Sequence, residues 1–273
     1  MHVPTITLND GHAIPQFGLG VYLMPPPQTQ ELVSTALELG YRHIDTAALY
    51  RNESGVGAAI AASGIPREEL FVTTKLWNDR HTDAEDAFAE SLERLALDYV
   101  DLYLIHWPCP QYDTFVQAWH ALERVQQRGL ARSIGVSNFH QEHLSRLIVE
   151  SDTVPAVNQI ELHPSLPQHE LVSFNTNLGI ATESWSPLGR SADLDSPTVT
   201  ALADALGRTP AQVILRWHIQ RGLIVFPKSS SRARLAENLD IFDFELDDSA
   251  MHALNAMGSD NRVGPDPTQF NRR

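Results

Sequence analysis

The chain has 273 residues and a formal net charge of −14, with 42% hydrophobic and 20% charged residues. A negative charge of this size repels nucleic acid and anionic membrane surfaces, and the sequence has no apolar run of about 18 residues that could span a bilayer. Cys109 is the single cysteine, which excludes an intrachain disulfide. The opening residues MHVPTITLND have neither the basic start nor the apolar stretch of a secretory signal, so we expect a cytoplasmic protein.

The predicted elements begin with a hairpin and continue as a regular alternation. Thr5–Ile14 carries the turn residues Asn9-Asp10-Gly11 between apolar runs, which is typical of a hairpin. Short apolar segments then alternate with segments of helical period, the pattern of βαβ units around a parallel sheet. We predict eight strands, at residues 17–20, 41–45, 70–75, 100–106, 132–136, 156–161, 180–185 and 223–227. Amphipathic helices are predicted at Thr82–Leu97, Thr114–Arg128 and Thr209–Gln220.

The end of the chain departs from this alternation. Asp247–Met257 has the pattern of an extra helix, and the polar residues after it, SDNRVGPDPTQFNRR, are expected to form a loose tail. No low-complexity linker divides the chain. The sequence therefore predicts one domain over residues 1–273, an α/β fold of the (β/α)₈ TIM barrel type with an N-terminal β-hairpin and an extra C-terminal helix.

Four polar residues support the barrel independently of the strand predictions. Asp45, Lys75, His106 and Ser137 each lie at the end of a predicted strand, separated by 30, 31 and 31 residues. One strand–helix repeat needs roughly 30 residues. We therefore expect the four side chains to meet at the C-terminal rim of the strands, where barrels of this class carry their chemistry.

The rim residues have a structural and a chemical interpretation. A buried Asp45 needs a cation, and Lys75 is the natural partner, so the two taken alone indicate no more than a structural ion pair. Tyr50, in the loop after Asp45, donates a proton poorly at neutral pH unless a positive charge stabilises its phenolate. His106 alone would be a core histidine, but beside a phenol its imidazole can orient a carbonyl oxygen. Tyr22, Trp77 and Trp107 either pack at the barrel mouth or wall a pocket for that oxygen.

The remaining motifs are one basic segment and several incomplete signatures of nucleotide or metal binding. The segment KSSSRAR, Lys228 to Arg234, is a basic exception in an acidic chain and could simply be a solvated helix start. The turns at Gly18-Leu-Gly20 and Gly55-Val-Gly57 lack the third glycine of a Rossmann fingerprint. The histidines show no ligand spacing typical of zinc, so no metal is predicted.

Six segments together resemble the aldo-keto reductases, over nearly the whole chain. They are HIDTAALYRNE (His43 to Glu53), TTKLW (Thr73 to Trp77), LIHWP (Leu104 to Pro108), IGVSNF (Ile134 to Phe139), NQIELHP (Asn158 to Pro164) and PKSSSRARLAEN (Pro227 to Asn238). Within the family, SWSPLGR (Ser184 to Arg190) and the short tail are most similar to the bacterial 2,5-diketogluconate reductase-like members. The resemblance implies NADPH-dependent reduction of aldehydes and ketones, dicarbonyls and keto-sugars included.

The resemblance also implies residue roles. Tyr50 would be the general acid, with Lys75 lowering its pKa, Asp45 holding Lys75 and His106 orienting the carbonyl. Lys228, Ser229 and Arg234 would hold the adenosine 2′-phosphate, and Ser230 is a further implied cofactor contact. The closest relatives carry arginine at Ser231, so the strength of the NADPH preference stays open, with Arg232 a candidate to compensate. The other cofactor contacts implied are Gly20, Val21, Asp45, Ser137, Asn138, Gln159, Trp185, Ser186, Leu188, Glu237 and Asn238.

Two further functional classes stay open at this point. One is an NADPH-binding regulatory or sensor subunit with vestigial catalysis, which the complete set of four catalytic residues disfavours. The other is a metal-dependent barrel hydrolase. We expect a small-molecule carbonyl substrate, no nucleic-acid or membrane partner, and a monomer. The outer wall of the pocket is expected from Pro110–Thr114 and the C-terminal tail.

Overall fold

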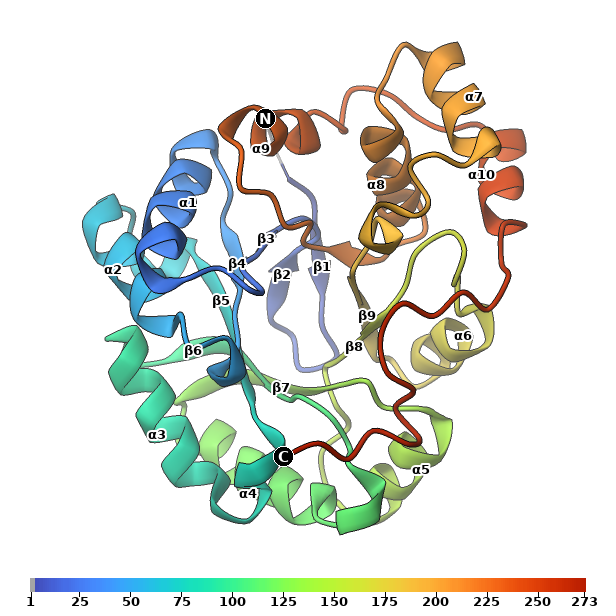
Figure 1. The fold of residues 1–273 in the computed structure, drawn as a ribbon. Coiled ribbons are helices and arrows are strands. Elements are labelled where there is room, and N and C mark those ends of the chain that lie inside the picture. Colours follow the sequence, from blue (N-terminus) through green and yellow to red (C-terminus); the bar gives the residue numbers. More distant parts are fainter. Residues whose placement is uncertain (1–2) are drawn as a thin grey trace.

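The computed structural model describes residues 3–273, in which eight parallel strands curl around a common axis (Figure 1). Each strand pairs with its neighbour in sequence, so the spatial order of the strands from β3 to β10 is the same as their order in the chain. The strands are β3 (Leu19–Gly20), β4 (His43–Asp45), β5 (Phe71–Leu76), β6 (Val100–Ile105), β7 (Ala131–Ser137), β8 (Val157–Glu161), β9 (Ala181–Trp185) and β10 (Ile224–Val225). All eight predicted strands are confirmed, with ends that differ by at most two residues.

A short seam joins the first and last strands. Phe17, just before β3, forms a parallel bridge with Val225 of β10. The amide of Gly18 donates to the Val225 carbonyl at 2.9 Å, and the amide of Val225 donates to the Gln16 carbonyl at 3.0 Å. Glycine is needed beside this seam, because a Cβ on Gly20 would lie 2.8 Å from the Phe226 carbonyl oxygen. The seam closes the sheet into the predicted barrel.

The helices form the outer layer of the barrel (Figure 1). Their bounds are α1 (Pro26–Leu39), α2 (Glu53–Ser63), α3 (Ala84–Leu95), α4 (Phe115–Gln127), α5 (Gln141–Val149), α6 (His169–Asn177), α7 (Pro197–Leu206), α8 (Pro210–Gln220), α9 (Arg232–Leu239) and α10 (Asp248–Asn255). Helix α8 begins as predicted, with a capping box in which Thr209 Oγ1 accepts from the Gln212 amide and Gln212 Oε1 accepts from the Thr209 amide. Helix α7 was not predicted; it precedes α8 between β9 and β10 and is a second helix in that repeat.

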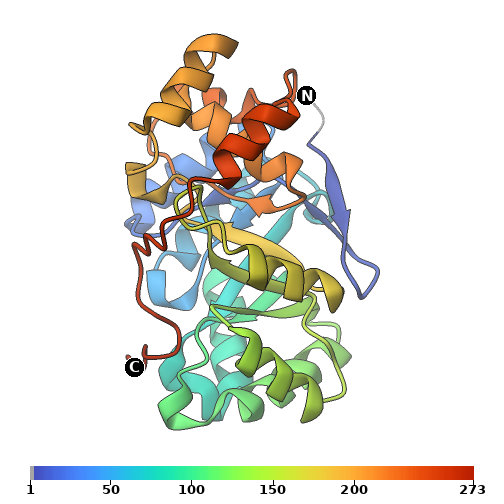
Figure 2. The same ribbon diagram turned by 90° about the vertical axis from the view of Figure 1, so that its right-hand side faces the viewer.

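The two ends of the barrel are covered by different segments (Figure 2). At one end lies the predicted hairpin, in which β1 (Thr5–Thr7) pairs antiparallel with β2 (Ala13–Pro15). Its Leu8 and Ile14 pack with inward-facing residues of the strands, including Phe71 and Leu102. The C-terminal segment after α10 crosses the opposite end. The hairpin therefore plugs the bottom of the barrel and leaves the other end for a site.

The prediction of a loose tail is wrong. The amides of Val263 and Gly264 donate to the two carboxylate oxygens of Glu161, at 2.5 and 3.0 Å. The Phe270 ring packs on Trp107 with centroids 4.3 Å apart. Polar composition suggested solvent exposure, but backbone donors and one aromatic ring suffice to fasten a polar segment to the barrel. Residues 261–273 therefore form one structural segment, the C-terminal strap.

No helix within residues 3–273 is long and apolar enough to cross a membrane.

Candidate active site

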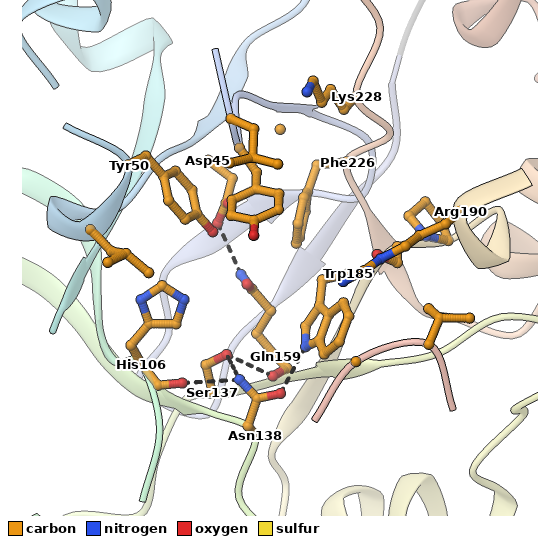
Figure 3. Close-up of a pocket in the computed structure, with 18 of the residues that line it drawn as sticks. Asp45, Tyr50, His106, Ser137, Asn138, Gln159, Trp185, Arg190, Phe226 and Lys228 are labelled. Carbon is orange, nitrogen blue, oxygen red and sulfur yellow. Dashed lines mark hydrogen bonds between the residues drawn. The ribbon is translucent and has the colours of Figure 1, made fainter. Parts of the chain in front are cut away.

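Adjacent strands deliver the predicted polar residues to the same rim of the barrel (Figure 3). Asp45 is the last residue of β4, Lys75 lies in β5, His106 follows β6 and Ser137 ends β7. In a parallel barrel the carboxyl ends of the strands share one rim. The structure thus brings together the residues that the regular spacing of about one repeat predicted.

Asp45 and Lys75 form a buried ion pair. Lys75 is fully buried, and its Nζ donates to Asp45 Oδ1 at 2.7 Å and to the Thr46 carbonyl at 2.9 Å. Burial by itself would lower the pKa of Lys75, but the neighbouring Asp45 carboxylate raises it above its usual value. Lys75 is therefore a cation at neutral pH, placed under the site where no solvent competes with it.

Tyr50 lies at the end of a short 3₁₀ turn, Ala48–Tyr50, that follows β4. Its hydroxyl accepts a hydrogen bond from Lys75 Nζ at 3.5 Å. Burial raises the pKa of Tyr50 to about 12, and the positive charge of Lys75 opposes this increase without overcoming it. At neutral pH the phenol is protonated and has a cation beside it that stabilises the phenolate left after proton transfer.

His106 is a neutral histidine beside Tyr50. Burial, together with a smaller effect of the Lys75 charge, lowers the pKa of His106 well below its usual value. Its Nδ1 is buried and has no hydrogen-bond partner among residues 3–273. Its ring contacts Tyr50 and Trp77 edge to face, with centroids 5.8 and 5.2 Å apart. The imidazole is therefore held by packing and keeps its polar atoms for a ligand.

A second group of polar residues lies on β7, β8 and β9. Asn138 is held in the left-handed region, with φ of 65°, and its amide donates to the His106 carbonyl and to Ser137 Oγ, both at 3.0 Å. Trp185 Nε1 donates to Asn138 Oδ1 at 2.8 Å. A non-glycine residue in this conformation costs free energy and is common at functional sites. The bonds of Asn138 fix the Trp185 ring at the edge of the cavity (Figure 3).

One cavity of about 1000 Å³ is lined by Asp45, Tyr50, His106, Ser137, Asn138 and Trp185, whereas Lys75 is not on its wall. Of the predicted cofactor residues, those on the cavity wall are Gly20, Asp45, Ser137, Asn138, Gln159, Trp185, Ser186, Leu188 and Lys228. The predicted substrate residues Tyr22, Trp77, His106 and Trp107 also line it. Others lie outside the cavity wall: Val21 and Asn238 are buried, Glu237 accepts a hydrogen bond from Thr209, Ser229 and Ser230 lie in the loop before α9, and Arg234 lies in its first turn.

Arg190 and Lys228 are two of the cations on the cavity wall (Figure 3). Lys228 was predicted and Arg190 was not. Neither forms an ion pair with an acidic side chain of residues 3–273, although the chain carries 34 acidic residues. Unpaired cations lining a cavity favour an anionic ligand, such as a phosphate group. Arg232 does not join them, because it is paired with Glu38 at 2.7 Å on the surface.

The C-terminal strap forms the outer wall of the cavity through Val263, Gly264, Pro265, Phe270 and Arg272. That part of the prediction is confirmed. Pro110–Thr114 is not on the cavity wall; it supports the strap, since the Gln111 amide donates to Asn271 Oδ1 at 2.9 Å. Leu23, Leu49 and Phe226 also line the wall and were not predicted there, since single apolar residues carry no distinguishing pattern.

A cluster behind the strap connects it to the loop after β9. Glu161 is buried and faces His163, whose Nε2 lies 3.2 Å from Glu161 Oε1 and whose Nδ1 lies 3.1 Å from Asp193 Oδ2. Despite burial, the two carboxylates raise the pKa of His163. A histidine between two acids links the strap on Glu161 to the 186–196 loop through Asp193.

No group of three or more histidine, cysteine, aspartate or glutamate side chains within residues 3–273 is placed to hold a metal ion.

The fold and the rim geometry define the class of protein, an oxidoreductase barrel with a tyrosine, a lysine and a histidine at one cavity. The Aldo/keto reductase family matches residues 16–258 of the chain. The chain belongs to this family, as the motifs indicated.

Named relatives and solved structures are similar to the chain over nearly its whole length. An aldo-keto reductase of Mycolicibacterium smegmatis is 55% identical over 270 residues, which cover 98% of each chain. The methylglyoxal reductase DkgA of Escherichia coli strain K12 is 48% identical over 267 residues, or 97% of each chain. Among solved structures, a mutant of Gox0644 in complex with NADPH superimposes with a TM-score of 0.95 at 46% identity, covering 99% of each chain.

Proposed function

We propose that this protein reduces aldehydes and ketones, small dicarbonyls included, to alcohols with NADPH as reductant and Tyr50 as the general acid. The observation that carries the proposal is the contact of Lys75 Nζ with the Tyr50 hydroxyl at the cavity wall. Residues 1–273 would act as one oxidoreductase domain. The name of the E. coli relative supports a dicarbonyl as substrate.

The cavity fits a nicotinamide dinucleotide at both ends. At the inner end, Gln159 and the half-buried Trp185 ring offer a polar contact and a stacking surface for a nicotinamide. At the outer end, Arg190 and Lys228 are free for phosphate groups. Ser137 and Asn138 would add contacts to the carboxamide, and Glu237 and Asn238 to the adenine. A bound NADPH supplies the hydride in this reaction.

The residues of the chain supply the proton and the orientation. His106, neutral and with unused ring nitrogens, donates a hydrogen bond to the carbonyl oxygen of the substrate. Tyr50 transfers its hydroxyl proton to that oxygen as the alcohol forms. Lys75 stabilises the phenolate that remains, and Asp45 holds Lys75 in place. Solvent returns the proton to Tyr50 after release of the alcohol.

The test is turnover of methylglyoxal, phenylglyoxal and 2,5-diketogluconate, followed by the absorbance of the reduced cofactor. Tyr50→Phe should bind NADPH as tightly as the wild type while its kcat falls by about 10²–10⁴, the usual contribution of a general acid. Undiminished turnover in this variant would refute the mechanism. Tight NADPH binding by the wild-type protein without turnover of any carbonyl would favour the regulatory subunit instead.

The preference for NADPH has its own test. Lys228 lies next to Ser229 and Ser230, with Arg234 in α9, and together they would bind the 2′-phosphate that NADH lacks. Lys228→Met should lower the affinity for NADPH by about tenfold and leave that for NADH nearly unchanged. An equal loss for both nucleotides would place Lys228 at the pyrophosphate.

A monomer in the cytoplasm is the proposed state of the protein. Every proposed catalytic side chain comes from one chain, so no second copy is needed to complete the site. The single cysteine, Cys109, is free and buried, as is usual in reducing compartments. Light scattering of the purified protein measures its mass directly.

A further inference from the structure

Glu183 is a buried acid for which the proposed chemistry has no use. It lies in the middle of β9, is fully buried, and is the direct cross-strand neighbour of Gln159 on β8. Its Oε2 accepts a hydrogen bond from Gln159 Nε2 at 2.8 Å, whereas its Oε1 has no hydrogen-bond partner within residues 3–273. A carboxyl group in a barrel interior costs several kcal/mol unless its interactions offset the loss of water. Its single good contact is the one to Gln159.

The side-chain amide of Gln159 is held between two carboxyl groups. Its Nε2 donates to Glu183 Oε2 at 2.8 Å and to Asp45 Oδ2 at 2.9 Å. An amide has two N–H donors on nitrogen and only acceptor capacity on oxygen, so the reversed orientation would set Oε1 against two acceptors. The main chain of Gln159 is fixed as well, since its carbonyl accepts from Ser137 Oγ and from the Asn138 amide.

This arrangement determines the direction in which the side-chain oxygen of Gln159, Oε1, points. With both N–H groups turned toward the acids, Gln159 Oε1 has no protein partner among residues 3–273, and Gln159 lines the cavity (Figure 3). The side-chain oxygen of the neighbouring Asn138 is already used, because it accepts from Trp185 Nε1 at 2.8 Å. Gln159 Oε1 is therefore the free amide acceptor at the inner end of the cavity, available to a ligand N–H.

We propose that Glu183 is a positioning residue for cofactor recognition: by accepting one N–H of Gln159 it fixes the Gln159 oxygen toward the cavity, where that oxygen accepts the carboxamide N–H of the nicotinamide. The inference rests on the proposed function, because it assumes a nicotinamide beside Gln159. It assigns to Glu183 no contact with the cofactor and no proton in the reaction.

The role does not depend on the charge of Glu183. Burial, with a further contribution from the negative charge of Asp45, raises the pKa of Glu183 to about 8. The neutral acid keeps a carbonyl oxygen as acceptor, and its proton can reside on Oε1, which has no hydrogen-bond partner and lies 4.0 Å from His43 Nε2. A neutral residue with an amide oxygen should therefore replace Glu183, and one without an acceptor should not.

Two matched substitutions separate the acceptor from the bulk of the side chain. Glu183→Gln and Glu183→Met are both unbranched, uncharged and similar in length, and only glutamine can accept from Gln159. The probe is the binding of NADP⁺ against its 3-acetylpyridine analogue, in which a methyl group replaces the carboxamide nitrogen. Both dissociation constants are measured by tryptophan fluorescence or calorimetry, without turnover. Should the methionine variant not fold, Glu183→Ala removes the same acceptor without adding bulk.

The wild-type protein and Glu183→Gln should bind NADP⁺ about tenfold more tightly than the analogue, the range of one hydrogen bond to a buried acceptor. In Glu183→Met this ratio should fall to about one, because the Gln159 oxygen is no longer fixed. General damage to the site would weaken both nucleotides and leave the ratio unchanged. A ratio near ten in Glu183→Met overturns the inference.

Gln159→Leu distinguishes failure of the inference from failure of the proposed function. Loss of the ratio in Gln159→Leu together with its loss in Glu183→Met supports the proposal. Loss in Gln159→Leu alone overturns the role of Glu183 and leaves the nicotinamide where it was proposed. A ratio that survives in Gln159→Leu shows that the nicotinamide lies elsewhere and overturns both.

Discussion

Lys75 carries a full positive charge at a position that no solvent reaches. The Asp45 carboxylate stabilises this buried charge. The pair lies in the barrel interior with 2.7 Å between Nζ and Oδ1. Removal of one partner from a buried pair leaves the other charge without compensation. The same two residues therefore take part in the proposed chemistry and affect the stability of the fold.

Lys75→Met should lower the free energy of unfolding by about 3–5 kcal/mol, since Asp45 is left unpaired in the barrel. The double variant Asp45→Asn/Lys75→Met should recover most of this loss, because it removes both charges. Urea denaturation of the wild type and of the two variants measures the difference. A double variant as unstable as Lys75→Met would show that packing, rather than charge, determines the cost.

At the residue scale, site residues that recur at the spacing of the strand–helix repeat could be predicted from the sequence, and site residues without such spacing could not. Asp45, Lys75 and His106 were predicted to meet because each ends a strand about one repeat after the previous one. Arg190 was not predicted, since a single arginine in a loop has no periodic relation to other residues. Glu183 was also missed; in the sequence it is one polar residue in a short strand, and only the cross-strand register places it beside Gln159.

At the scale of elements, one carboxylate holds the first residues of the C-terminal strap. Glu161 accepts both the Val263 and the Gly264 amides, and no Cβ fits at Gly264, which packs against Trp185 and Glu161. Glu161 is thus the attachment point of the part of the strap around Val263 and Gly264, which lines the cavity. The substrate side of the cavity should respond strongly to one carboxylate that is not on its wall.

Glu161→Gln leaves one acceptor oxygen for two backbone donors, so one of the Val263 and Gly264 amides faces an NH₂ group and the strap should loosen. The KM for a carbonyl substrate should rise by about tenfold or more, the equivalent of one lost hydrogen bond to a charged group. Limited proteolysis should cut residues 261–273 faster than in the wild type. The matched control is Glu142→Gln, an exposed glutamate on α5. Equal protection of the strap in both variants would contradict this interpretation.

Elements were predicted well where hydrophobic period and capping agree. Helix α8 has Thr209 as its N-cap, Pro210 at the first helical position and Gln212 completing a capping box, and its start was predicted to within one residue. The strap was mispredicted because its order comes from Glu161, about a hundred residues earlier in the chain. Helix α7 was missed because the alternation of strands and helices provides for one helix per repeat.

At the scale of the whole molecule, the barrel is sensitive to acid. His43 and His218 are fully buried, and burial lowers the pKa of each to about 3. An unfolded histidine has a pKa of about 6.5, so unfolding between these values takes up one proton per histidine. The stability that these histidines provide is present above about pH 6.5 and is lost as the pH falls toward 3.

Between about pH 6 and pH 4, His218 should make the free energy of unfolding fall by about 1.4 kcal/mol for each unit by which the pH is lowered. The variant His218→Gln lacks this contribution, so its free energy of unfolding should fall less steeply by that amount. Glutamine can still donate to the Pro187 carbonyl, which accepts from His218 at 3.1 Å. Urea denaturation across this pH range gives the slope, and the exposed His252 provides the control His252→Gln. Identical slopes for His218→Gln and the wild type would refute the assignment.

The seam between Phe17 and Val225 also determines when the barrel can close during synthesis. The two residues are 208 positions apart, and a ribosome adds about 5–20 residues per second. For about 10 to 40 seconds the nascent chain therefore holds an edge strand whose partner has not been made. An open edge is a template for pairing with another chain. The newly synthesised protein thus depends on its folding environment until the last repeat emerges.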